Sequence, residues 1–243
     1  MINYSIKQHT VFQTLLFHLL PGALITLIFI MLGPWLKNHN LPPILALLIP
    51  ILLVLIPFEL GWICFQGYRR NGSFSFAGVV SNLDALPPKS YLIFIPILLS
   101  WPILIFMSFG KIDQAIITNV FYWLPDWFQI NLFSPDDYNL HIRIITFVLF
   151  LVVNGLAGPI VEELYFRGYL LPRMEYLKGW APLVNVALFS LYHFFSPWQF
   201  ITRIIAFYPW AFVVRWKKNI FISMAAHCLL NIGYCLLSIR SFF

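Results

Sequence analysis

Six polar side chains in the C-terminal half of the chain have types and spacings that could carry out hydrolysis. They fall on three apolar stretches, as Glu162, Glu163 and Arg167, then His193, then His227 and Asn231. A carboxylate beside a histidine can take a proton from water, a general-base step worth about 10²–10⁴-fold in rate. An imidazole N–H and an amide N–H one helical turn apart can both donate to a developing oxyanion. Together these groups are sufficient to hydrolyse an amide bond in a dry pocket.

The spacing of these residues indicates how they divide the work. Residues four apart share a helix face, so Glu163 can pair with Arg167, and His227 can project beside Asn231. Glu162 is rotated by about 100° from Glu163 and cannot share that ion pair equally. We therefore expect one acid to hold the arginine and the other to remain for chemistry. Taken alone, the Glu163–Arg167 pair is equally well explained as a structural ion pair.

A divalent metal is an alternative use of the same side chains. Glu and His are ordinary zinc ligands, so a metal here would be held by Glu162, His193 and His227. The helical HExxH signature of zinc peptidases is missing. The sequence therefore requires no cofactor and leaves zinc open.

The elements that must position these residues are membrane helices. The chain is 60% hydrophobic and only 10% charged, with a mean hydropathy of +0.82. An ordinary soluble chain is about a quarter charged, which excludes a soluble domain. The net charge of +6 comes from basic residues scattered between apolar runs, without a basic face that could bind nucleic acid. The expected partner is the lipid bilayer. Cys64, Cys228 and Cys235 form no CxxC pair and are expected as buried thiols, without a disulfide framework or a metal cluster.

Helices are expected because a segment in lipid must satisfy its own backbone hydrogen bonds. The fold class is thus an all-α transmembrane bundle with the site between the fourth, fifth and seventh spans. An interfacial segment is expected within 111–140. The seven predicted spans are 11–36, 41–65, 91–110, 141–170, 180–196, 200–214 and 219–239.

The bias of Lys and Arg places the N-terminus in the cytoplasm and the C-terminus outside. A bacterial-type inner membrane or a plasma membrane fits this multi-pass pattern. The chain divides into N-terminal membrane helices with the interfacial segment, 1–140, and a core of 141–243, both within one integrated domain.

Ionisable residues within spans are expensive, costing about 2.5–3.5 kcal/mol at mid-bilayer, so they usually face a bundle interior or a cavity. Three charges on the 141–170 span therefore need partners or a function. Glu59, His18 and Arg203 are also predicted within spans, and we interpret them as interhelical hydrogen-bonding groups. Arg203 is unusual, and it makes the 200–214 span the least typical of the seven.

The three motifs, in this order on three membrane helices, resemble the CAAX-protease and bacteriocin-processing family, which includes the type II CAAX prenyl endopeptidases. "EELYFRGYL" and "NIFISMAAHCLLNIGY" are similar to its first and last motifs, and the likeness covers about residues 145–240. The resemblance implies an intramembrane endopeptidase acting on a peptide or on the C-terminus of a lipidated protein. It further implies that Glu162 and His193 activate water, His227 and Asn231 stabilise the oxyanion, and Glu163 and Arg167 brace the site.

Two other functions fit parts of the pattern. A non-catalytic immunity or peptide-binding protein could keep this scaffold without hydrolysis. A proton-coupled transporter also uses buried acids and histidines, but the chain shows no inverted repeat or paired broken helices.

Overall fold

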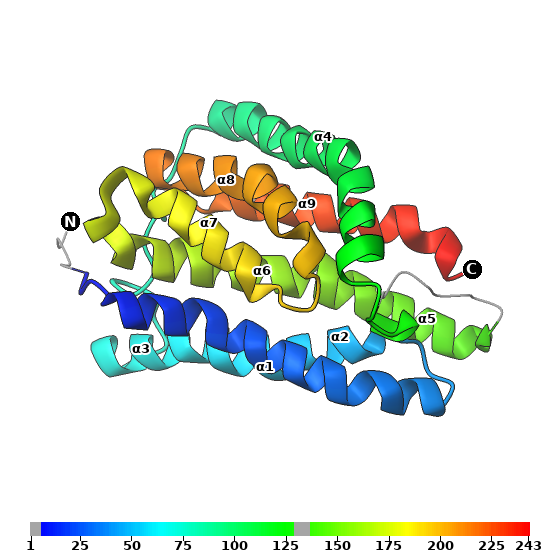
Figure 1. Cartoon of the computed structure of the whole chain (residues 1–243). Coiled ribbons are helices and arrows are strands. Elements are labelled where there is room, and N and C mark those ends of the chain that lie inside the picture. Colours follow the sequence, from blue (N-terminus) through cyan, green and yellow to red (C-terminus); the bar gives the residue numbers. More distant parts are fainter. Residues whose placement is uncertain (1–5, 129–136) are drawn as a thin grey trace.

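The computed structural model describes residues 6–128 and 137–243, and in this part of the chain helices form the whole fold, as predicted (Figure 1). Figure 1 shows α4 along one side of the bundle, α1 and α3 along the opposite side, and α6 to α9 between them. The helices are α1 (Val11–Asn38), α2 (Leu45–Pro50), α3 (Gly61–Asn71), α4 (Pro88–Val120), α5 (Leu140–Leu149), α6 (Gly158–Glu162), α7 (Ala181–Tyr192), α8 (Phe200–Lys217) and α9 (Phe221–Leu237).

Helical segments of other pitch join several of these helices end to end. π-Helical turns at Ile51–Leu60 connect α2 to α3, and those at Phe150–Ala157 connect α5 to α6. A further π-helical segment, Glu163–Leu170, follows α6 directly and runs into the tighter turns of Leu171–Trp180. π-Helical turns are rare and are often found at functional sites.

Among the described residues, five helical runs are long and apolar enough to cross a membrane, which makes the chain an integral multi-pass membrane protein. The run Leu140–Tyr192 contains the span predicted at 141–170 and all but the last four residues of the span predicted at 180–196. It is broken near Met174 and Lys178, where the backbone is not helical. The span predicted at 200–214 corresponds to α8, which is not among the five, so the count of seven stays a prediction. The termini lie at opposite ends of the bundle (Figure 1).

The predicted interfacial segment within 111–140 begins later than expected. Helix α4 continues through Val120, ten residues past its predicted end, and a short turn follows at Asp126–Phe128. The additional residues of α4 include Asp113, which is buried and therefore tied to the bundle rather than to its surface. The remainder of the predicted segment falls partly at 129–136, outside the described residues.

Helix α1 begins and packs through local features of its sequence. Thr10 and Gln13 form a reciprocal capping box, with each side chain accepting from the other residue's backbone N–H. Further along, Gly22 lies against the backbone of Tyr192, and a Cβ on Gly22 would collide with the Tyr192 carbonyl. Small residues allow membrane helices to approach this closely. Gly22 therefore lets α1 press directly on the end of α7.

Helices α4 and α8 are joined by an exchange of tryptophan hydrogen bonds. A proline inside a helix cannot donate to the carbonyl four residues earlier, so Pro102 frees the Leu98 carbonyl and Pro209 frees that of Ile205. The indole N–H of Trp210 donates to the Leu98 oxygen at 2.7 Å. The indole of Trp101 donates to the Ile205 oxygen at 2.9 Å. Each tryptophan thus fills the gap opened by the proline of the other helix. We call this arrangement the Trp–Pro exchange.

A loop from the N-terminal part of the chain ties the later helices together. The Ser81 N–H donates to the Gly168 carbonyl at 2.8 Å, and the Asn82 amide donates to that of Arg167 at 3.1 Å. The loop then pairs with the turn before α9 through the Leu83–Asn219 bridge. Segment 81–84 therefore links the helix that carries the glutamates to the helix that carries His227. We call this segment the linking loop.

The outer surface of the bundle is apolar. Leu92 and Met107 on α4 are 77% and 78% exposed, and Leu237 at the end of α9 is 84% exposed. A soluble monomer rarely shows so extended an apolar face, which is the face a bilayer would cover. The three cysteines are free thiols. Cys235 is buried as predicted, whereas Cys64 and Cys228 are only half-buried, so their predicted burial is wrong.

Candidate active site

The two adjacent glutamates lie where α6 ends and the π-helical segment Glu163–Leu170 begins. The sequence up to this point is apolar, with Gly158 and Pro159 opening α6, so both carboxyl groups are carried into the bundle interior. Their exposure differs: the Glu162 side chain is 12% exposed and that of Glu163 is fully buried. Only the first of the two carboxyl groups is therefore accessible from outside the protein.

Glu163 is held by three other side chains. Its Oε1 lies 3.6 Å from Nη1 of Arg167 and 3.1 Å from Nδ1 of His227. Its Oε2 accepts a hydrogen bond of 2.6 Å from the Ser223 hydroxyl. This carboxylate thus pairs with Arg167, as its spacing predicted, and the bracing role that the resemblance implies stays a prediction. Ser223 was not predicted, although its place four residues before His227 on one helix face could have indicated it.

Glu162 is much less engaged than its neighbour. Its Oε2 lies 3.8 Å from Nε2 of His227, and no hydrogen bond to its carboxyl group occurs among the described residues. The rotation between consecutive residues explains the difference, because Glu162 and Glu163 approach opposite nitrogens of the same imidazole. Glu162 is therefore the acid whose oxygens are left to bind a water molecule.

Arg167 is fully buried, and its guanidinium lies 4.1 Å from the centroid of the Phe189 ring. None of its three side-chain nitrogens has a hydrogen-bond partner among the described residues. Its contact with Glu163 is thus a charge interaction supported by a cation–π contact, for which Arg is well suited. Phe189 comes exactly one helical turn before His193, and its role was not predicted.

His193 ends α7, with backbone angles outside the helical region. Its Nδ1 lies 2.8 Å from the Phe189 carbonyl oxygen, so Nδ1 carries the proton and Nε2 is left as an acceptor. The ring packs against the aromatic rings of Tyr192 and Phe195. No hydrogen bond or ion pair joins His193 to Glu162 in the described residues. Its assistance to Glu162 therefore stays a prediction.

Asn231 lies one turn beyond His227 on α9, as the spacing predicted. Its amide nitrogen donates to the Asn154 carbonyl at 2.8 Å, which ties α9 to the π-helical segment Phe150–Ala157. Because an amide NH₂ has two hydrogens, this bond uses one donor and leaves the other. Asn231 therefore braces two helices here, and its expected bond to an oxyanion stays a prediction.

Helix α8 forms one wall of this cluster. The rings of Phe207 and Trp210 lie 6.0 Å and 5.0 Å from the imidazole of His227, centroid to centroid. These contacts were not predicted, because α8 had no motif of its own. The Trp–Pro exchange holds α8 from its other side through Trp210, so α4 indirectly fixes the surroundings of His227.

The residues predicted to hold zinc do not form a metal site in this structure. Among the described residues, no group of three His, Cys, Asp or Glu side chains is arranged to hold a metal ion. Glu162 and His227 lie 3.8 Å apart, but His193 contacts neither of them. Glu and His side chains are suitable ligands for zinc, but Glu162, His193 and His227 are not arranged around a common point in this structure.

The other ionisable residues predicted within spans, His18, Arg203 and Glu59, are not bonded to the acid–histidine cluster in the described residues. His18 on α1 accepts from the Asn185 amide of α7 at 3.1 Å, so it is an interhelical hydrogen-bonding group as predicted. Arg203 bonds instead to Ser196 and Gln199 in the turn before its own helix, so the interhelical bond predicted for it is not found among the described residues. Glu59 is fully buried, yet neither of its oxygens has a hydrogen-bond partner among the described residues. The hydrogen bond predicted for Glu59 is thus not found.

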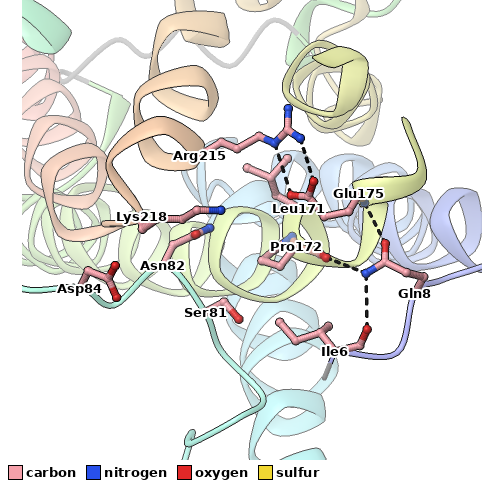
Figure 2. A pocket seen from close by; sticks show the side chains of 10 residues that line it. All are labelled: Ile6, Gln8, Ser81, Asn82, Asp84, Leu171, Pro172, Glu175, Arg215 and Lys218. Carbon is pink, nitrogen blue, oxygen red and sulfur yellow. Dashed lines mark hydrogen bonds and ion pairs between the residues drawn. The ribbon is translucent and has the colours of Figure 1, made fainter. Parts of the chain in front are cut away.

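A cavity of about 460 Å³ opens at the end of the bundle nearest the N-terminus, and none of the six predicted site residues lines it (Figure 2). Figure 2 shows Lys218 and Asn82 on one side and the Arg215–Glu175 ion pair on another. The segment before α1 borders the cavity, where Gln8 bonds to the Pro172 carbonyl. Burial, with the nearby Arg173 charge, lowers the pKa of the adjacent His9 to about 4. Ser81, Asn82 and Asp84 of the linking loop line this cavity.

The fold and the geometry of the site define a class of protein: an all-α membrane bundle with a buried acid–histidine cluster. Residues 144–233 match the family described as type II CAAX prenyl endopeptidase Rce1-like. This part of the chain is therefore a domain of that family, and membership implies an intramembrane protease. Comparison with curated proteins and with solved structures gives no match.

Proposed function

We propose that this protein is an intramembrane endopeptidase in which Glu162 activates a water molecule to hydrolyse a peptide bond. The observation that carries the proposal is the unequal engagement of two neighbouring acids. Glu163 is bound by Arg167, His227 and Ser223, whereas Glu162 is the more exposed and accepts no hydrogen bond from the described residues. A general base needs a free oxygen within reach of water, which Glu162 has.

The proposed reaction begins when Glu162 removes a proton from a water molecule as its oxygen attacks the carbonyl carbon of the scissile bond. The carbonyl electrons move to the oxygen, giving a tetrahedral oxyanion. When the C–N bond breaks, the proton held by Glu162 passes to the leaving nitrogen, so the acid returns to its starting state. Nε2 of His193, left without a proton by the bond from Nδ1 to Phe189, is the second acceptor available to the water.

His227 can stabilise the oxyanion only in one protonation state. Its Nδ1–H donates to Glu163, so the neutral ring presents a bare Nε2 toward Glu162. A second proton at Nε2 would turn this nitrogen into a donor that could reach the oxyanion. The free amide hydrogen of Asn231 is the second proposed donor. Loss of one oxyanion donor typically costs about 10²–10³-fold in rate.

The proposed substrate is the C-terminus of a lipidated, CAAX-like protein, or another peptide tethered to the membrane. Two features support this choice. The matching family is described by its action on CAAX prenyl proteins. The bundle also exposes large apolar side chains around its perimeter, such as Leu92 and Met107, so a lipid-anchored tail would share the bilayer with the enzyme.

The proposal is tested by replacing Glu162 with glutamine, which keeps the shape of the side chain and removes the base. The protein is reconstituted in nanodiscs and given an internally quenched, farnesylated peptide that ends in a CAAX sequence. We expect Glu162→Gln to lower kcat at least about 10²-fold, the range that general-base catalysis spans. Mass spectrometry of membrane peptides from cells with either form identifies the natural product.

The matched control is Glu175→Gln, which changes an acid paired with Arg215 near the end of the bundle. This variant should cleave the peptide at the wild-type rate. Cleavage by Glu162→Gln at the wild-type rate would refute the proposed base. Immunity or peptide capture that survives Glu162→Gln without any cleavage product would instead support the non-catalytic alternative.

A further inference from the structure

A second buried arginine, Arg203 on α8, fastens the turn that follows His193. Its Nη1 donates to the Ser196 carbonyl at 3.1 Å. Its Nη2 donates both to the Ser196 hydroxyl and, at 2.8 Å, to Oε1 of Gln199. Arg203 is only 6% exposed, so these bonds form away from bulk water. A single guanidinium thus holds both the backbone and the side chain of Ser196.

The turn held in this way also determines where His193 lies. The Ser196 N–H donates to the His193 carbonyl at 2.9 Å, which closes the turn directly on the histidine. His193 itself has left the α-helical conformation, with ψ at 52°, so α7 alone does not fix its backbone. The position of its ring therefore depends on the turn 193–196 as well as on the Phe189 carbonyl, and Arg203 holds this turn.

Arg203 is supported in turn by α4. The neighbouring Thr202 hydroxyl donates to Oδ1 of Asp113 at 2.6 Å, and Asp113 is only 6% exposed. The Trp–Pro exchange fixes α4 against the same helix a few residues further on. Two helices therefore hold the arginine that holds the turn.

We propose that Arg203 is a positioning residue, which holds the His193 imidazole in the geometry that the reaction needs. This inference rests on the proposed function, because His193 is there an acceptor for the attacking water. Arg203 bonds to the turn rather than to reacting atoms, so it acts through His193. A displacement of about 1 Å in a catalytic group can cost about 10²-fold in rate.

The kinetic test uses Arg203→Met and Arg203→Lys in nanodiscs with the farnesylated, internally quenched peptide. We expect Arg203→Met to lower kcat about 10²-fold with KM changed less than about 2-fold, since Arg203 acts through His193 and not on the peptide. Lysine has one nitrogen and cannot reproduce the fork of bonds, so Arg203→Lys should restore only part of this loss. Arg215→Met, the same change on an exposed arginine of α8, is the matched control and should behave as wild type.

A second variant covers the case in which Arg203→Met fails to fold. The double change Ser196→Ala and Gln199→Ala removes two acceptors and leaves the arginine and its charge in place. We expect it to lower kcat about 10-fold with KM unchanged. Values of kcat within 2-fold of wild type, or losses confined to KM, in both this variant and Arg203→Lys would overturn the proposal.

A chemical readout separates this proposal from the proposed function. The rate at which diethyl pyrocarbonate modifies His193 is followed by peptide mass spectrometry, with His227 as internal reference. Release of the turn should speed modification of His193 by about 3-fold or more in Arg203→Lys and in the double variant, and leave His227 unchanged. An unchanged His193 rate refutes the positioning role even if Glu162 proves catalytic. A wild-type protein without Glu162-dependent cleavage refutes the proposed function, and the labelling rates then decide the role of Arg203.

Discussion

Two of the buried arginines of this protein, Arg167 and Arg203, are held in opposite ways. Arg167 lies in the acid–histidine cluster, and none of its side-chain nitrogens has a hydrogen bond among the described residues. It contacts Glu163 at 3.6 Å and covers the face of Phe189. Arg203 donates to Ser196 and Gln199 in directed bonds. Arg167 therefore stabilises its surroundings through its positive charge, whereas Arg203 does so through hydrogen bonds of defined direction.

The difference follows from what each arginine must hold. A carboxylate can be stabilised by a positive charge from several directions, so Arg167 needs only to lie near Glu163. A turn of backbone has to be held in one shape, which requires bonds of defined direction, and the planar fork of Arg203 supplies them. Substitutions that separate charge from geometry should therefore affect the two sites differently.

The largest expected effect on stability comes from Arg167→Met. This change leaves the fully buried Glu163 without its cationic partner, and removal of one member of a buried pair costs about 3–5 kcal/mol. The free energy of unfolding in detergent, measured by SDS titration, is the quantity to compare. Arg215→Met removes a partly exposed pair and should cost about 1 kcal/mol or less. A loss below about 1 kcal/mol in Arg167→Met would show that charge is not what Arg167 supplies.

Substitution by lysine should have a smaller effect on the free energy of unfolding, and the loss should be larger at Arg203 than at Arg167. Arg167→Lys retains the charge and loses no directed hydrogen bond, so it should cost about 1 kcal/mol or less. Arg203→Lys loses part of its fork, and hydrogen bonds to charged groups contribute about 1.5–3 kcal/mol each. The same SDS titration of both variants gives the comparison. Equal losses in the two variants would remove the distinction drawn between the arginines.

The smallest effect is expected from the Trp–Pro exchange, where neutral groups supply the geometry. Trp210→Phe leaves the Leu98 carbonyl without its donor, and Trp101→Phe does the same to that of Ile205. Interhelical hydrogen bonds in membranes average about 0.6 kcal/mol and reach about 1.7 kcal/mol, so each change should cost an amount in this range. Trp180→Phe, at a side chain that is 68% exposed, serves as the control. No difference between the control and either variant would contradict the exchange.

The sequence predicted the acid cluster better than the helix that supports it. Glu163, Arg167 and His227 could be assigned because their spacing on single helices restricts where side chains point, and the contacts among them follow from that. Arg203 could only be recognised as unusual. Its support from Asp113 joins residues about 90 positions apart, and no local pattern predicts which distant helix packs there.

The helix boundaries show the same contrast: boundaries set by neighbouring residues could be predicted, and boundaries set by tertiary packing could not. The start of α1 was predicted at the residue observed, and Thr10 and Gln13 show why. The end of α4 was predicted ten residues too early, because Lys111 and Asp113 suggested that the membrane ended there. Asp113 is instead buried against Thr202, a contact made possible by tertiary packing. The bond that occupies Asn231 also joins helices distant in sequence.

The linking loop has a consequence for how this protein can be divided. It belongs to the first half of the chain, yet Ser81 and Asn82 are bound to the carbonyls of Gly168 and Arg167. A fragment that began at residue 144 would contain every predicted catalytic side chain and would lose these supports. The segment that carries the predicted catalytic residues therefore cannot be transferred by itself. A chimera that places it among foreign helices must also include the linking loop, or another segment that donates hydrogen bonds to those two carbonyls.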